Sequence, residues 1–180
     1  AGKPLVLHVV EKCRLFSNEV LLILRRNADP EKYLQVVEPK ARLVHDESES
    51  RAPLVGISSG LAAVKNSYTA VFSCDLPFLN KRASELLFSE AEGVDAAIPV
   101  WPDGTLEPLH SVYRVDPSLK AARESLANGE LSNYDMIRRL KRVKEIPVER
   151  FRSIDPNLHS FFNVNSPEEL EEAEALSRRP

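Results

Sequence analysis

The sequence predicts a Rossmann-like α/β fold, in which helices cover both faces of a mostly parallel, twisted sheet. Short apolar runs typical of buried strands alternate with segments of helical length, and the connections between them are short. Parallel neighbours need crossover helices, so this alternation indicates parallel pairing. After residue 100 an Asp-Gly turn leads into another apolar run. We expect that run to be antiparallel to its predecessor or to lie over the sheet.

The first half of the chain accounts for most of the parallel strands. Residues 4–15 have apolar positions at helical spacing, and Pro4 suits a first helical turn. Continuous apolar runs then predict parallel strands at 19–24, 41–45 and 69–74. Asp29 followed by Pro30 is a typical helix start. The other elements expected here are helices at 30–37, 54–65 and 80–91 and a strand at 95–100.

The second half is expected to complete the sheet and close on a helix. Pro147 makes its strand an edge strand, because proline cannot donate to a central ladder. Ser166 and Glu169 have the spacing of a capping box, which marks the start of the last helix. The expected elements are a turn at 101–105, a strand at 106–114, a helix at 116–128, a short helix capped by Ser132 or Asn133, strands at 143–148 and 161–165, and a helix at 166–179.

Composition narrows the class of protein. A chain of 180 residues with 43% hydrophobic and 28% charged residues is long enough to bury a core, and we expect a single domain over residues 1–180. The net charge of −3 argues against nucleic acid as a partner. No apolar run approaches the roughly 20 residues of a membrane span. Cys13 and Cys74 show no metal-ligand spacing, so a reduced cytoplasmic protein is expected.

The stretch VFSCDLPFLN (71–80) is the strongest sign of a site. Its apolar run passes Cys74, expected to be a buried strand thiol, and ends on Asp75, which either caps the following turn or binds a charged ligand. Ligands of open α/β sheets bind beyond the carboxyl ends of the strands. Asp46 ends another predicted strand at that edge, although it could equally be a loop aspartate in the stretch DESESR. A carboxylate in this position suits Mg²⁺ held together with substrate phosphates.

Three other sequence features could have either a functional or a structural role. Gly56 could let a nucleotide approach free N–H groups at a helix start, or could serve close packing of a helix on the sheet. Alternation puts Asn163 and Asn165 on one face, which could serve a site or belong to a polar turn. The basic run at 138–144 is either a solvated helix end or a cationic patch near an acidic substrate or partner.

The order of six segments points to a known family. They are GKPLVLHVVEK, LVHDES, APLVGISSGLAAV, VFSCDLPFLN, EPLHSVYR and FFNVNSPEEL. From Gly2 to about Leu170 the chain resembles the molybdenum cofactor guanylyltransferases, the molybdopterin-guanine dinucleotide biosynthesis protein A family. This resemblance implies a three-layer nucleotidyltransferase fold, GTP and molybdopterin as substrates, and Mg²⁺ as cofactor. The implied reaction transfers GMP from GTP to molybdopterin and releases pyrophosphate.

The resemblance also implies roles for individual residues. Asp75 would bind Mg²⁺ and the nucleotide, and would be the catalytic carboxylate. Further nucleotide contacts are expected from Asp46, from Gly56 and from Arg25, where relatives can carry an asparagine. The acceptor molybdopterin is expected to meet the family's asparagine pair, Asn163 and Asn165.

One departure from the family stands at the front of the sequence. Relatives carry a central strand and a Gly-rich loop of the form LAGGxSxRMGxxK before the GKP motif, which here occupies residues 2–4. We expect the native protein to carry that segment too, because a sheet without its centre would expose strand edges. The competing functions are transfer to another phosphorylated acceptor and a non-catalytic nucleotide-binding module. Partners among molybdoenzymes or cofactor-handling proteins are compatible with the lead hypothesis.

Overall fold

The computed structural model describes residues 2–178. Its helices are α1 (Leu5–Cys13), α2 (Glu31–Val37), α3 (Pro53–Ala63), α4 (Lys81–Ala91), α5 (Val115–Ala127), α6 (Asn133–Arg139) and α7 (Pro167–Ser177), with 3-10 helices η1 (Val148–Ser153) and η2 (His159–Phe161). Its strands are β1 (Leu21–Leu24), β2 (Arg42–His45), β3 (Tyr68–Phe72), β4 (Ala96–Val100), β5 (His110–Arg114) and β6 (Val143–Pro147). No helix in this part of the chain has the length and apolar character needed to cross a bilayer.

The strands form two sheets. In the larger sheet, with strand order β3-β5-β4-β6, β5 runs antiparallel to both of its neighbours, and β6 pairs parallel with β4 at the edge. In the smaller sheet β1 pairs parallel with β2. The mixed α/β architecture is the one expected from sequence. The run at 106–114 does contain an antiparallel strand, and the strand with Pro147 does lie at an edge.

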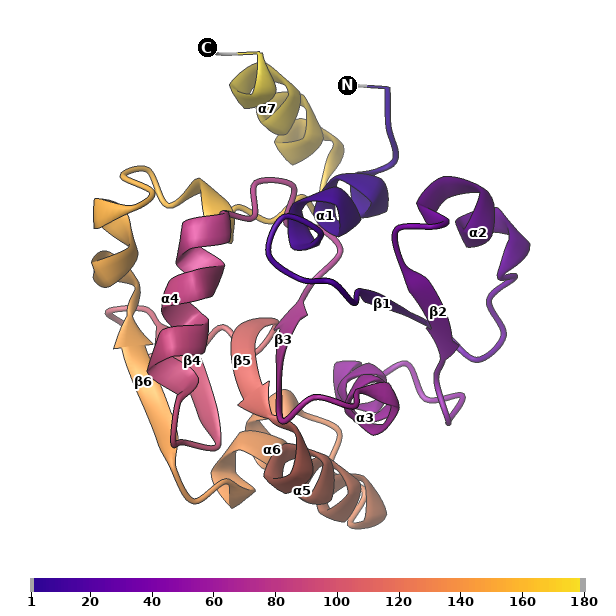
Figure 1. Ribbon diagram of the computed structural model, residues 1–180, viewed down its shortest axis with the longest axis vertical. Coiled ribbons are helices and arrows are strands. Elements are labelled where there is room, and N and C mark those ends of the chain that lie inside the picture. Colours follow the sequence, from indigo (N-terminus) through magenta and orange to yellow (C-terminus); the bar gives the residue numbers. More distant parts are fainter. Residues whose placement is uncertain (1, 179–180) are drawn as a thin grey trace.

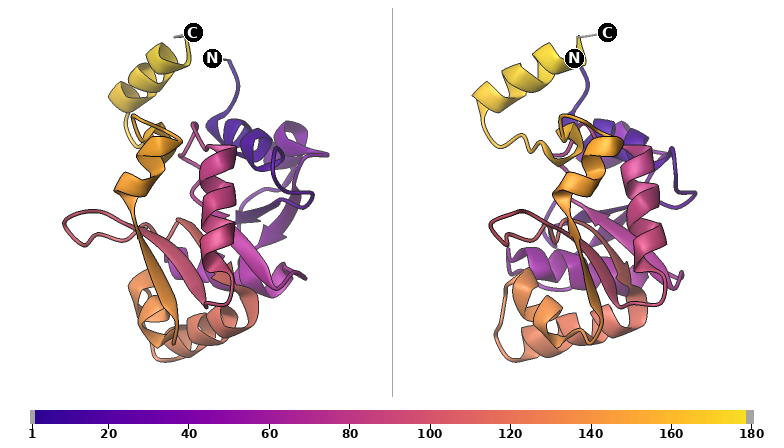
Figure 2. Two further views of the ribbon diagram at one scale, coloured as in Figure 1. Left: turned by 60° about the vertical axis from the view of Figure 1, so that its left-hand side comes forward. Right: turned by 90° about the vertical axis from the view of Figure 1, so that its left-hand side faces the viewer.

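Helices cover both faces of the larger sheet, which gives three layers (Figures 1 and 2). Alternation along the strands divides the core between the faces. Ala96 of β4 and Tyr113 of β5 pack with α3, α5 and α6. Their neighbours Ala97 and Val112 pack on the other face with α4, η1 and η2. Both cores therefore meet on β4 and β5, the buried centre of this sheet.

A slot of about 540 Å³ separates the two sheets. Strands β1 and β3 form its long walls, and residues of α1 and α3 line it as well. Within residues 2–178, β1 pairs only with β2 and β3 only with β5, so each has an unpaired edge. This explains why only Leu24 of β1 is buried, although its sequence is typical of a fully buried strand.

Local signals placed most element boundaries correctly. Ser132, rather than Asn133, caps α6, and Ser166 with Glu169 forms the expected capping box of α7. Four of the five cations in the basic run form ion pairs within the fold: Arg138–Asp135, Arg139–Glu130, Arg142–Asp95 and Lys144–Glu90. It is therefore a structural element of the α6–β6 connection.

Two expected strands differ in the structure. The strand expected at 69–74 was predicted to be parallel, but among the described residues β3 pairs only with β5, and antiparallel. It also ends at Phe72, so that Asp75 follows in a turn. Residues 161–165 form no strand. The first of them ends η2, and the others form an extended segment. One backbone hydrogen bond, from Val164 N to Asp75 O at 2.9 Å, joins this segment to the Asp75 turn. One bond is too few to make a ladder.

His110 is a titratable residue buried in the core. Its ring stacks on Phe161 at 4.4 Å between centroids and meets the edge of Phe72 at 5.2 Å. Neither ring nitrogen has a hydrogen-bond partner among the described residues. Burial lowers the pKa of His110 from 6.5 to about 3, and the charge of Asp155 only partly opposes this. The folded protein therefore holds a neutral imidazole.

We predict that His110→Phe makes the protein less sensitive to acid. The pKa of His110 is lowered in the folded protein, so the unfolded chain binds a proton below pH 6.5, whereas the native state binds it only below about pH 3. The free energy of unfolding therefore falls as the pH drops through this window. Its slope can reach about 1.4 kcal/mol per pH unit. The measurement is urea unfolding at pH 7, 5.5 and 4. An equal loss of stability in wild type and variant would contradict the prediction.

Candidate functional site

The register between β3 and β5 determines where a site can form. Phe72 of β3 lies opposite His110 of β5, and the ladder extends by one bond from Ser73 N to Leu109 O at 2.9 Å. Because the strands are antiparallel, the end of β3 and the start of β5 leave the sheet together. The turn carrying Asp75 and the segment carrying Glu107 therefore emerge side by side.

A third segment joins them from near the end of the described chain. Val164 N donates to Asp75 O at 2.9 Å, which holds the extended segment against the turn. The capping box of α7 fixes its far end, since the Glu169 carboxylate accepts from Asn165 N at 2.6 Å. Alternation around Val164 then sends Asn163 and Asn165 to the same side, as the sequence indicated.

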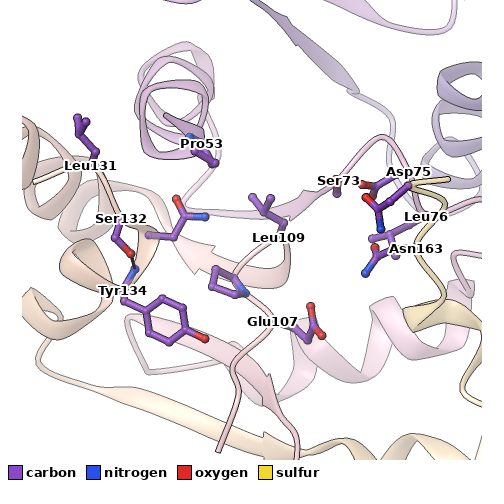
Figure 3. A pocket seen from close by; sticks show the side chains of 13 residues that line it. Pro53, Ser73, Asp75, Leu76, Glu107, Leu109, Leu131, Ser132, Tyr134 and Asn163 are labelled. Carbon is purple, nitrogen blue, oxygen red and sulfur yellow. Dashed lines mark hydrogen bonds between the residues drawn. The ribbon is translucent and has the colours of Figure 1, made fainter. Parts of the chain in front are cut away.

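These segments, together with residues at the starts of α3 and α6, line a pocket of about 390 Å³ (Figure 3). Its lining residues are Pro53, Ser73, Asp75, Leu76, Glu107, Pro108, Leu109, Leu131, Ser132, Asn133, Tyr134, Asn163 and Asn165. Asp75 Oδ1 is buried and has no hydrogen-bond partner within residues 2–178. Buried polar atoms are nearly always paired, so this oxygen is suited to a ligand. Capping of the following helix falls to Asn80, which accepts from two backbone N–H groups. Asp75 is thus not the cap of that helix.

A second group of candidates lies at the carboxyl ends of β1 and β2. The parallel register pairs Leu24 with His45, so Arg25 and Asp46 follow at the same edge. Asp46 N donates to Leu24 O at 2.8 Å, and His45 Nδ1 lies 3.3 Å from Arg25 O. Arg25 is exposed and Asp46 is half-buried. Asp46 therefore directly follows the end of β2, as expected from the sequence.

Gly56 lies beside Asp46. It is inside α3, not in a loop before it, and a methyl group added at Gly56 would come within 3.7 Å of Asp46 Oδ1. That oxygen is buried and has no partner in the described part of the chain. Desolvation raises the pKa of Asp46 above its ordinary value, and interaction with Ser59 and the charges of His45 and Arg25 oppose the rise.

The first turn of α3 connects the two groups. Pro53 lines the Asp75 pocket, whereas Gly56, one turn further on, faces Asp46 and the slot. The structure thus joins Asp75 with Asn163 and Asn165 in one pocket, and places Asp46, Gly56 and Arg25 together outside it. Cys74, expected to be a buried thiol, is exposed in the turn before Asp75.

The pocket contains oxygen atoms that suit a metal ion bound jointly with a substrate. Within the described residues, no three His, Cys, Asp or Glu side chains gather into a protein-only metal site. Asp75 offers one unpaired carboxylate oxygen, and the side-chain carbonyls of Asn163 and Asn165 are hard oxygen donors. Mg²⁺ is usually held by one or two carboxylates plus substrate phosphates and water, so these residues fit that ion.

Two residues on the opposite side of the pocket were not predicted from the sequence. Glu107 lies in the quoted segment EPLHSVYR but was given no role, and Asn133 was considered only as a helix cap. The turn at 101–105 hides their proximity, because it brings the 106–109 segment back under α6. No local pattern reports that long-range contact.

Comparison with known proteins identifies the family. The profile of the family described as "MobA-like NTP transferase domain" matches residues 1–143, which is most of the chain. A probable molybdenum cofactor guanylyltransferase of Methanosarcina mazei is 33% identical over 175 residues, covering 94% of this chain and 77% of the relative. One from Natronomonas pharaonis is 33% identical over 174 residues, covering 96% and 84%.

Comparison with solved structures supports the same family assignment. Molybdopterin-guanine dinucleotide biosynthesis protein A from Archaeoglobus fulgidus superposes with a TM-score of 0.82 at 28% identity, over 98% of this chain and 87% of that one. The fold is shared by a 2-C-methyl-D-erythritol 4-phosphate cytidylyltransferase from Thermus thermophilus, with a TM-score of 0.74 at 17% identity. The match covers 99% of this chain and 90% of that one. The pocket at the β3 end thus lies on a nucleotidyltransferase scaffold, and the chain belongs to the MobA-like NTP transferase family.

Proposed function

We propose that this protein transfers GMP from GTP to molybdopterin, forming molybdopterin guanine dinucleotide and releasing pyrophosphate. One observation carries the proposal beyond family membership: the unpaired Asp75 oxygen in a pocket that also contains Asn163 and Asn165. The names of the relatives from Methanosarcina mazei and Natronomonas pharaonis support GTP and the molybdenum cofactor as substrates. We propose that the reaction takes place in the cytoplasm and that no nucleic acid takes part in it.

The two groups of site residues bind different substrates in this proposal. The acceptor's phosphate oxygen forms a bond to the α-phosphorus of GTP, and the bond from that phosphorus to the β-phosphate oxygen breaks, so pyrophosphate leaves. Asp46, Gly56 and Arg25 hold the nucleotide at the carboxyl ends of β1 and β2. Asn163 and Asn165 hold the acceptor in the pocket that they share with Asp75. Catalysis then consists of positioning and charge neutralisation, with no covalent enzyme intermediate.

A divalent cation fits this arrangement. Bound by Asp75 together with the phosphates, Mg²⁺ supplies neutralisation of the charge that builds up on the transferred group. Asp75 would hold that ion in place. Its backbone is bonded to Val164, and its Oδ1 makes no hydrogen bond to another described residue.

The function is tested with labelled GTP, molybdopterin and the Asp75→Asn variant. Wild type should form labelled dinucleotide and release pyrophosphate, whereas Asp75→Asn should be slower by at least about 100-fold, because it loses the charge that holds the cation. The melting temperature should not fall, since Asp75 Oδ1 supports no bond in the fold.

Asp116→Asn is the matched control. Asp116 is exposed in the first turn of α5, outside the pocket, so this variant should keep wild-type turnover. Near-normal turnover of Asp75→Asn at saturating Mg²⁺ would reject the assigned role. Transfer to another phosphorylated acceptor but not to molybdopterin would reject the proposed function itself.

Gly56→Ala should separate stability from nucleotide binding. The added methyl group meets only ordinary contacts at 3.7 and 3.9 Å, and alanine in a helix interior is favoured over glycine by roughly 0.5–1 kcal/mol. The melting temperature should therefore rise slightly. The KM for GTP should rise at the same time, because the methyl group covers Asp46 Oδ1.

The control for this variant is Gly60→Ala on the same helix, where the new methyl group would face Ile23 at 3.4 Å instead of Asp46. It should leave the KM for GTP unchanged. An unchanged KM in Gly56→Ala as well would remove Gly56 from the nucleotide site.

We also propose that one further β-strand occupies the slot between β1 and β3 and completes a continuous sheet in this single-domain protein. The slot supports this, because two unpaired strand edges line it and helices α1 and α3 contribute to its walls. A Gly-rich loop after such a strand would bring backbone N–H groups to the triphosphate.

Hydrogen exchange of the native protein tests the added strand. If the slot is filled, the amides on the free edges of β1 and β3 should exchange as slowly as those of the buried strand β5. Fast exchange on both free edges, together with slow exchange in β5, would show that no strand occupies the slot.

A further inference from the structure

The side of the pocket across from Asp75 has no part in the transfer step described above. Figure 3 shows Ser132 and Tyr134 on one side, Asp75 and Asn163 on the other, and Leu109 between them. A pocket of about 390 Å³ has room for more than a reacting phosphate. The distal side is therefore the place where the rest of the acceptor would be recognised.

The start of α6 is held rigidly on this side. Ser132 Oγ accepts from Tyr134 N at 3.2 Å, and the Asp135 carboxylate accepts from Ser132 N at 3.2 Å. The Tyr134 hydroxyl accepts from Leu106 N at 3.2 Å and donates to Leu106 O at 3.4 Å, which ties α6 to the segment before β5. These neighbours meet the capping needs of the helix, so Asn133 is left free.

Asn133 has an unused acceptor inside the pocket wall. Its Oδ1 is buried and has no hydrogen-bond partner anywhere in the part of the chain that the structure describes. A helix-capping role, the alternative use of an asparagine at this position, belongs to Ser132. An unpaired buried carbonyl oxygen is unfavourable in the free protein and becomes favourable when a ligand donates to it.

Glu107 provides a second fixed acceptor. Its Oε1 accepts from Trp101 Nε1 at 2.6 Å, and its backbone N donates to Pro99 O at 3.0 Å. Oε2 makes no hydrogen bond to another residue within 2–178, so one oxygen of a well-oriented carboxylate remains for a ligand. The pocket lining also contains apolar side chains, among them Pro108 and Leu109.

We propose that Asn133, assisted by Glu107, determines which acceptor is used by accepting N–H hydrogen bonds from its heterocyclic ring. Two oxygen acceptors and apolar walls suit a flat ring that carries amino and ring N–H donors, as a pterin does, better than a hydroxyl-rich sugar. The inference rests on the proposed function, since it describes the acceptor side of the same site. Asn133 is a specificity-determining residue and takes no part in bond breaking.

The test compares Asn133→Leu and Asn133→Asp by steady-state kinetics with GTP and molybdopterin. Leucine keeps the size and removes the acceptor, so the KM for the acceptor should rise roughly 10-fold. Aspartate keeps an oxygen at the same place and should restore a KM near that of wild type. The KM for GTP should not change in either variant, and the melting temperature of Asn133→Leu should not fall.

Two further variants complete the design. Asn157→Leu changes an exposed asparagine outside the pocket and should behave as wild type. Glu107→Gln keeps the oxygen bonded to Trp101 and replaces the other by a donor, so it should also raise the acceptor KM. An acceptor KM of Asn133→Leu equal to wild type would overturn the inference while leaving the proposed function intact.

If wild type does not transfer GMP to molybdopterin, the proposed function fails first. Fluorescence titration of wild type and Asn133→Leu with molybdopterin then decides the inference separately. Binding at least several-fold weaker in the variant would support it, and equal or absent binding in both proteins would overturn it.

Discussion

The antiparallel ladder between β3 and β5 is the constraint on which the candidate site depends. Because Phe72 lies opposite His110, the chain leaves the sheet at one place in two directions: toward the Asp75 turn and back toward Glu107. Tyr113 and Val112 of β5 also anchor the two halves of the core. A shift of one residue in this ladder would turn these core side chains to the wrong faces. Core burial therefore enforces the register that builds the pocket.

The unpaired polar atoms show how stability and function separate in this molecule. Among the described residues, the side-chain oxygens of Asp46, Asp75 and Asn133 are buried without partners, and all three lie in or beside the candidate site. Each costs about 1–3 kcal/mol while unpaired. His110 is also unpaired, but it stacks on Phe161, meets the edge of Phe72 and packs as an apolar group. Asp75 and Asn133 line the pocket, whereas His110 does not.

The elements were largely predictable because they follow from local patterns, whereas the pocket was only half predictable. Apolar periodicity and caps such as Ser132 act within a few residues. The proximity of Asp75 and Asn163 depends on one backbone bond between segments about 90 residues apart, and only the family resemblance anticipated it. Glu107 and Asn133 were missed for the same physical reason. Their meeting depends on the turn at 101–105 and on the Tyr134–Leu106 bonds. Strand length was overestimated at β3 because the pattern of apolar residues continues past the last ladder bond.

Helix α3 shows why one sequence feature had two valid readings. From sequence, Gly56 was expected either to pack the helix closely on the sheet or to admit a nucleotide. Gly60 serves the first purpose, because a methyl group there would touch Ile23 of β1 at 3.4 Å. Gly56, four residues earlier on the same face, leaves Asp46 Oδ1 uncovered instead. The close approach that Gly60 permits is what brings Gly56 over the end of β2. In this helix, tight packing and access to the carboxylate are therefore one structural requirement.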